Sequence, residues 1–168
     1  MVSWALLSCA AVVCTQAMEV AHWEIGTHKQ PDSAAGFHLT VWAPKTKTKT
    51  HPPTLLFVTG FGAKVEASAY SEVLGLIAAN NFIVVGADLH SSGSPDYPAL
   101  GQVLGNTTVP FLSTSIFVDT FAAHGVIATP DVATSLAIGG HSAGNHIAVQ
   151  SVVDGCGPVK AVVMVDPV

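Results

Sequence analysis

The sequence contains no arginine, and only 10% of its residues are charged. Its six lysines stand against eleven acidic residues, which gives a net charge of −5. Proteins that hold nucleic acid or anionic lipid through charge carry clustered basic side chains. The composition therefore excludes a basic nucleic-acid footprint and a polybasic membrane surface.

Long apolar runs are also missing, and no stretch is long enough to cross a bilayer. An apolar segment near the N-terminus extends only from Trp4 to Val13. Small residues follow it before a cleavage point after Ala17, a pattern typical of a secretory signal peptide. A buried first strand or helix is the alternative. We expect residues 1–17 to be a signal peptide of a secreted protein, and residues 18–168 to be the N-terminal part of a single domain.

Cysteine is scarce, with three residues, two of which lie in the expected signal peptide. Cys156 would then stand alone in the mature chain and could form no internal disulfide. Its setting in "DGCGP" favours a buried small side chain over a reactive thiol. In a secreted chain, the tripeptide that starts at Asn106 is an acceptor sequence for N-glycosylation.

Apolar runs alternate with helical patterns along the chain. Strands are predicted at 37–44, 53–60, 82–88, 134–140 and 159–166, the first of them at an edge because it ends in proline. Helices are predicted at 68–81, 110–123 and 143–153, and the segment 89–102 is predicted to be a loop because it is rich in turn formers. This alternation indicates an α/β fold with a doubly wound, mostly parallel sheet that is covered on both faces.

Three of the strand ends carry glycine or polar residues, in "VTGFGAK", "IGGHSAGN" and "VMVDPV". Because ligands of such sheets bind beyond the carboxyl ends of the strands, we expect these three segments to meet at one edge.

Residues Gly140 to Gly144 fit the pattern G-x-S-x-G between a predicted strand and a predicted helix. In that setting a sharp turn lifts the serine oxygen clear, and the small neighbours allow the backbones to approach closely. Ser142 is therefore a candidate nucleophile, with Gly140 and Gly144 as the glycines of the elbow. The alternative is a glycine-rich turn in which the serine only caps the helix.

Acyl transfer also needs two backbone N–H donors for the oxyanion of the tetrahedral intermediate. Ala143, which follows the serine, would supply one donor. Phe61, in the loop "TGFGAK", would supply the other, since Gly60 and Gly62 let that loop turn tightly. A plain glycine turn is the alternative for this loop.

With these motifs in place, the chain resembles the α/β-hydrolases, and more narrowly the chlorophyllase branch, which is related to the platelet-activating-factor acetylhydrolases. The resemblance covers "LLFVTGFGAK", "NNFIVVGADLH", "LAIGGHSAGN" and "AVVMVDPV", from Pro53 to the last residue. It implies that Asp166, 24 positions beyond Ser142, is the triad acid. The chain departs from chlorophyllases at Ala143, where arginine is common, and at Thr59-Gly60, where they have His-Gly.

In this fold the chain order is serine, acid, histidine. Only Pro167 and Val168 follow Asp166, and the last histidine is His146, which lies one turn into the helix after the serine and is expected to aim away from it. His141 is expected to make a structural contact, and His90 to lie near the rim of the site. The remaining histidines are assigned to the surface or a strand edge (His28, His38, His51) and to a helix end (His124). We expect the chain to be truncated after the strand that carries the acid, with the catalytic histidine beyond it.

The sequence thus predicts a serine carboxyl-ester hydrolase that acts on hydrophobic esters through an acyl-enzyme on Ser142. No cofactor is implied, and no cluster of histidine and cysteine has metal-ligand spacing. A secreted, catalytically inactive binding protein with a hydrolase-like fold is the alternative. A nucleotide-binding fold is disfavoured, because "GFGAKV" lacks the third glycine of G-x-G-x-x-G.

Overall fold

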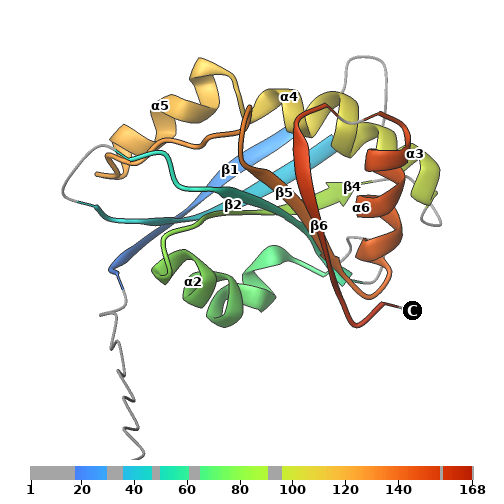
Figure 1. The fold of residues 1–168 in the computed structure, drawn as a ribbon, viewed down its shortest axis with the longest axis horizontal. Coiled ribbons are helices and arrows are strands. Elements are labelled where there is room, and N and C mark those ends of the chain that lie inside the picture. The colour runs from blue at the N-terminus through green and yellow to red at the C-terminus, as the bar shows by residue number, and fades with distance from the viewer. Residues whose placement is uncertain are drawn as a thin grey trace, which may run out of the picture.

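The computed structural model describes residues 18–29, 36–46, 50–60, 65–90, 96–155 and 157–167. A twisted sheet of six strands runs through these residues (Figure 1). In chain order the strands are β1 (Val20–Lys29), β2 (Gly36–Pro44), β3 (Thr54–Val58), β4 (Ile83–His90), β5 (Leu136–His141) and β6 (Val159–Val165). Across the sheet their order is β1-β2-β4-β3-β5-β6.

The sheet is mostly parallel. β3 pairs in parallel with β4 and with β5, and β5 pairs in parallel with β6, whereas β2 runs antiparallel to β1 and to β4. Parallel neighbours need crossover connections, and helices supply them here. The predicted α/β fold with a mostly parallel, doubly wound sheet is confirmed.

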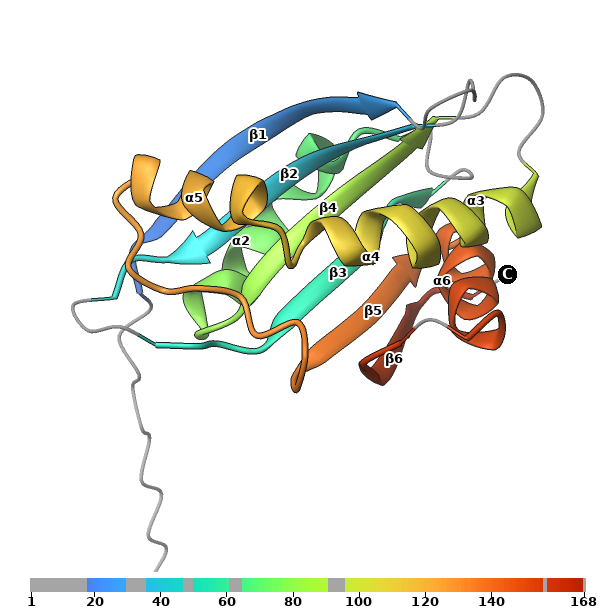
Figure 2. The ribbon, with the colours of Figure 1, turned by 90° about the horizontal axis from the view of Figure 1, so that it is seen from above.

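Helices cover both faces of the sheet (Figures 1 and 2). The 3₁₀ turn η1 (Ala67–Tyr70) and helix α2 (Ser71–Ala79) lie on one face. The other face carries α3 (Tyr97–Val103), the π-helical turn η2 (Leu104–Thr108), α4 (Val109–Phe111), α5 (Ser115–Ala123) and α6 (Gly144–Val153). The predicted helix at 110–123 is interrupted, because Thr114 caps a new helix there by accepting the N–H of Phe117 at 3.3 Å.

Each face of the sheet has its own hydrophobic core. The larger core lies under α3 to α6 and contains fully buried Leu104, Phe117 and Ile147. The smaller core lies under α2, where Leu74 packs with Trp42 and other strand residues. All five residues of β3 are buried, as expected for a central strand covered on both faces.

The strand at 37–44 was expected at an edge, and this was wrong. β2 lies between β1 and β4, and the edge is formed by β1, a strand that the sequence analysis did not predict. β1 has the alternation of a half-buried strand: Ala21, Trp23 and Ile25 are buried, whereas the residues between them are exposed. The alternation that predicts a half-buried strand was therefore present in the sequence of β1.

The segment 89–102 was expected to be a loop, and this was wrong at both of its ends. β4 continues to His90, and α3 begins at Tyr97. Asp96 caps this helix by accepting the N–H of Ala99 at 3.1 Å, and Pro98 lies in its first turn. An aspartate followed by an early proline is a helix-start signal, and here it outweighs the turn-forming composition.

The last strand has the apolar composition of a buried strand, yet it is the outermost one. Four successive large apolar side chains on β6 are 40–55% exposed: Val162, Val163, Met164 and Val165. Among the described residues, β6 pairs only with β5, so its second edge has no partner strand.

Candidate active site

Ser142 lies in the turn between the end of β5 at His141 and the start of α6 at Gly144. Its backbone φ is +51°, in the left-handed region that residues other than glycine rarely adopt. Such strain persists only where the surroundings hold it, and it is common at functional turns. This is the strand-turn-helix geometry that the G-x-S-x-G pattern requires of a nucleophile elbow.

The two elbow glycines lie where no side chain fits. A Cβ on Gly140 would lie 2.5 Å from the carbonyl carbon of Gly144, and a Cβ on Gly144 would lie 2.4 Å from the carbonyl oxygen of Thr59. The glycines therefore let α6 begin directly against the carboxyl end of β3. As a result, the loop that follows β3 starts beside the elbow.

The end of β6, which is followed by the acid that the resemblance implies, lies beside the elbow. The N–H of Ser142 donates to the carbonyl oxygen of Val165 at 3.0 Å, and the side-chain amide of Asn145 donates to the same oxygen at 2.9 Å. Asp166 is the next residue, with a backbone φ of +45° and an exposed side chain. The end of β6 is thus tied to the elbow by two hydrogen bonds on one carbonyl.

One of the two predicted oxyanion donors can be placed. Ala143 is the N-cap residue of α6, and N–H groups at a helix start have no intrahelical acceptor. Phe61, the other predicted donor, and Gly62 lie outside the described residues. Gly60, the last described residue before them, donates its N–H to the hydroxyl of Tyr70 at 3.0 Å.

Neither histidine near the elbow is hydrogen-bonded to Ser142. His141 bonds through Nδ1 to the hydroxyl of Tyr70 at 2.9 Å, which confirms the expected structural contact. His146 lies on the exposed side of α6, where its ring stacks on Tyr97 with centroids 5.4 Å apart. Within the described part of the chain, no histidine side chain is hydrogen-bonded to Ser142.

The other histidines lie away from the elbow or cannot be described. His124 ends α5, as expected, and stacks on Trp23 at 4.8 Å. His51 bonds to Thr129 at 2.9 Å in an exposed position. The assignment of His38 to the surface or a strand edge needs correction, because β2 is an inner strand and the Nδ1 of His38 lies 3.4 Å from the carboxylate of buried Asp88. The side chains of His28 and His90 lie outside the described residues.

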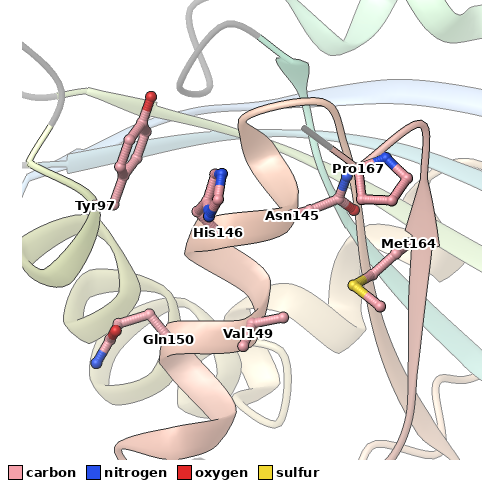
Figure 3. A pocket seen from close by; sticks show the side chains of 7 residues that line it. All are labelled: Tyr97, Asn145, His146, Val149, Gln150, Met164 and Pro167. Carbon is pink, nitrogen blue, oxygen red and sulfur yellow. The ribbon is translucent and has the colours of Figure 1, made fainter.

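A pocket lies beside the elbow helix, between α3, α6 and the end of β6 (Figure 3). Its volume is about 340 Å³, and it is lined by Tyr97, Asn145, His146, Val149, Gln150, Met164 and Pro167. Asn145 is only 4% exposed, and its Oδ1 has no hydrogen-bond partner. Sequence reasoning did not identify Asn145 or Tyr70, since neither belongs to a motif.

Asn106, the expected acceptor of N-glycosylation, is exposed on η2. Among the described residues, no group of three or more His, Cys, Asp or Glu side chains could hold a metal ion. In the same residues no helix is long and apolar enough to span a membrane. The expected signal peptide at 1–17 and Cys156 are not among the residues described.

No protein-family model and no curated protein sequence matches this chain. Solved structures do match. An esterase of the fungus Rhizomucor miehei superposes with a TM-score of 0.62 at 17% identity, over 92% of this chain and 46% of its own. Esterase B from Lactobacillus rhamnosis gives 0.58 at 16% identity, over 88% and 49%. An α/β hydrolase from the metagenome of Lake Arreo gives 0.51 at 22% identity, over 89% and 44%.

The chain spans about half the length of these solved enzymes. At these levels of identity the match concerns the fold, and it agrees with the strand order and the helix placement described above. The chain therefore has the α/β-hydrolase fold.

Proposed function

We propose that the intact protein is a serine carboxyl-ester hydrolase and that Ser142 is its nucleophile. The observation that carries this proposal is the backbone of Ser142, which has a φ of +51° between β5 and α6 and is flanked by two glycines whose positions leave no room for a side chain. A turn that only capped the helix would not need this strained conformation.

In the proposed reaction, the Oγ of Ser142 forms a bond to the ester carbonyl carbon and loses its proton to a histidine. The tetrahedral oxyanion is held by the N–H groups of Ala143 and Phe61. The alcohol then leaves with the proton from the histidine, and water hydrolyses the acyl-enzyme. Asp166 orients the histidine, which we place outside these 168 residues.

The substrate class follows from the resemblance to chlorophyllases through "VMVDPV" and the elbow. We infer a hydrophobic ester, such as one with a long alcohol of the phytol type. The solved esterases of similar fold support ester hydrolysis in general, and esterase B from Lactobacillus rhamnosis was crystallised with a tributyrin phosphonate. Secretion of the protein, with residues 1–17 removed, is part of the same proposal.

The test is covalent labelling by a fluorophosphonate, in which the serine oxygen bonds to phosphorus and fluoride leaves. In the intact protein, which includes the histidine, we expect labelling at Ser142, no labelling of Ser142→Ala, and unchanged labelling of Ser151→Ala. The 168-residue chain has no base for Ser142 in this proposal, so its hydrolysis of p-nitrophenyl butyrate should stay close to background. Labelling that persists in Ser142→Ala would refute the proposed nucleophile.

A second candidate is a secreted binding protein with a hydrolase-like fold. It is favoured by one observation: no described histidine side chain is hydrogen-bonded to Ser142, and both histidines near the elbow bond or stack elsewhere. Sequencing the 3′ end of the native transcript separates the two candidates. A coding region that continues past Val168 and supplies a histidine supports the esterase, whereas a stop codon after Val168 supports the binding protein.

A further inference from the structure

Tyr70 joins the loop after β3 to the residue that precedes the nucleophile. Its ring lies edge-on against Phe57 of β3, with centroids 5.4 Å apart, and against His141 of β5 at 5.6 Å. Its hydroxyl lies 3.0 Å from the backbone nitrogen of Gly60 and 2.9 Å from Nδ1 of His141. One side chain from η1 therefore contacts both strand ends that form the proposed site.

The direction of the first hydrogen bond follows from the atoms. The backbone N–H of Gly60 can only donate, so the hydroxyl oxygen of Tyr70 accepts it. The second bond has two arrangements: the hydroxyl donates to Nδ1 when the ring proton of His141 is on Nε2, and accepts from Nδ1 when the proton is there. In the first arrangement the two bonds point the same way along one chain, so each strengthens the other, and we expect this one.

A side chain at position 60 would force this contact apart. A Cβ there would lie 2.7 Å from Nδ1 of His141 and 2.8 Å from the hydroxyl of Tyr70. The carbonyl oxygen of the same glycine accepts the N–H of Val65 at 3.5 Å. Both backbone groups of Gly60 are thus bonded, at the point where the loop of the predicted oxyanion donor begins.

We propose that Tyr70 is a positioning residue that holds Gly60, beyond the carboxyl end of β3, against the nucleophile elbow, with His141 as its partner. This inference rests on the proposed function for its catalytic consequence, but the holding of Gly60 can be tested without activity. In the arrangement with the ring proton on Nε2, neither ring nitrogen of His141 is free to accept the proton of Ser142, because Nδ1 is bonded to the tyrosine.

The chain offers a matched pair of variants because it has two tyrosines. Tyr70→Phe removes the hydroxyl at the elbow, and Tyr97→Phe removes the same atom from the pocket beside α6. In amide hydrogen exchange followed by NMR, Tyr70→Phe should speed exchange at Gly60 about fivefold, the loss of one ordinary hydrogen bond. The amide of Ala99, which bonds to Asp96, serves as an internal reference and should not change.

The ¹⁵N signals of His141 supply a second readout. These signals would not change if the ring of Tyr70 acted only through packing. In the unmodified chain Nδ1 should be the unprotonated acceptor and Nε2 should carry the proton. Tyr70→Phe should abolish this preference, whereas Tyr97→Phe should keep it. Unchanged exchange at Gly60 together with unchanged His141 signals in Tyr70→Phe would overturn the proposal.

The catalytic consequence is measured in the intact protein, by the rate of fluorophosphonate labelling at Ser142. Tyr70→Phe should lower this rate roughly tenfold or more, because a small displacement of a positioned donor is costly. His141→Asn, whose side-chain oxygen can accept the tyrosine proton, should label faster than His141→Leu. Equal rates in the unmodified intact protein and its Tyr70→Phe variant would overturn the positioning role. Absence of labelling in the intact protein and in every variant would refute the proposed function, and the exchange and ¹⁵N results would then decide the role of Tyr70.

Discussion

The N–H of Ser142 donates to the carbonyl oxygen of Val165 at 3.0 Å, across the end of the β5–β6 pair. The side chain of Asn145 donates to the same oxygen at 2.9 Å. A backbone hydrogen bond therefore links the proposed nucleophile to the residue that precedes the proposed acid. The position of Asp166 relative to the elbow depends on this junction.

Loss of the second hydrogen bond at this junction should weaken the fold. Asn145 is almost fully buried, so Asn145→Ala should lower the free energy of unfolding by about 1–2 kcal/mol. Urea titration measures this quantity. Asn80→Ala is the matched control, because Asn80 donates to the carbonyl of Leu76 at 2.8 Å but in an exposed position, and its loss should cost less than about 0.5 kcal/mol. Equal effects of the two substitutions would contradict the junction's importance.

The strained backbone of Ser142 predicts an unusual order of stability. Ser142→Gly should be more stable than Ser142→Ala by about 1 kcal/mol, because glycine adopts a positive φ without a Cβ clash. At Ser151, inside α6, the order should be reversed by a similar amount, since glycine is about 1 kcal/mol less favourable than alanine in a helix. Denaturant unfolding of all four variants checks both signs, and the same order at both positions would argue against the strain.

The open edge of β6 should make the 168-residue chain self-associate. An apolar strand with unpaired backbone groups is a template for pairing with another chain. Val162→Lys on β6, where the side chain is 40% exposed, should reduce light scattering at high protein concentration. Val153, at the end of α6, is 73% exposed. Val153→Lys changes the net charge by the same amount and should reduce the scattering less. If both variants scatter alike, charge alone explains the change.

Asp131 makes stability depend on pH in the acidic range. The side-chain hydroxyl and the backbone N–H of Thr134 both donate to its carboxylate, and these hydrogen bonds lower the pKa of Asp131 below its ordinary value of 3.8. Because the folded-state pKa is lowered, the stabilisation is present above pH 3.8 and is lost as the pH falls through the lower, folded value.

Removal of the hydroxyl donor tests this dependence. Thr134→Val should lower Tm at neutral pH, and the difference from the unmodified chain should shrink as the carboxylate becomes protonated. Thr120→Val is the control, because the hydroxyl of Thr120 donates to the backbone carbonyl of Phe117 at 2.7 Å, an acceptor that does not titrate. Its effect on Tm should therefore not shrink in acid. A Tm difference for Thr134→Val that is constant with pH would show that the hydroxyl acts through packing and not through the carboxylate.

Much of the fold could be predicted because central parallel strands are buried on both faces and must be apolar throughout. The runs at 53–60, 82–88 and 134–140 carry that signal, and they correspond to β3, β4 and β5. Two errors came from local composition. Proline at position 44 suggested an edge, although it stands at the very end of β2. The turn formers before Tyr97 hid the cap of α3.

The candidate site was predictable where it is local in sequence. Ser142, its two glycines and Ala143 form one pentapeptide with His141, and a strand-to-helix turn follows from those residues alone. Tyr70 and Asn145 were not predictable in this way. Each acts through a contact with a distant residue, 71 positions away for Tyr70 and His141, and 20 for Asn145 and Val165.

The sequence by itself determined the alternation of strands and helices, the turn that exposes Ser142, and the glycines that permit it, because hydrophobic period and backbone freedom are properties of neighbouring residues. Only the tertiary structure decided that β1 forms the edge, that Val165 bonds to the elbow, and that Tyr70 bridges Gly60 and His141. These relations are hydrogen bonds and packing contacts between segments far apart in the chain. They exist only once burial of the two cores has brought the carboxyl ends of the strands together.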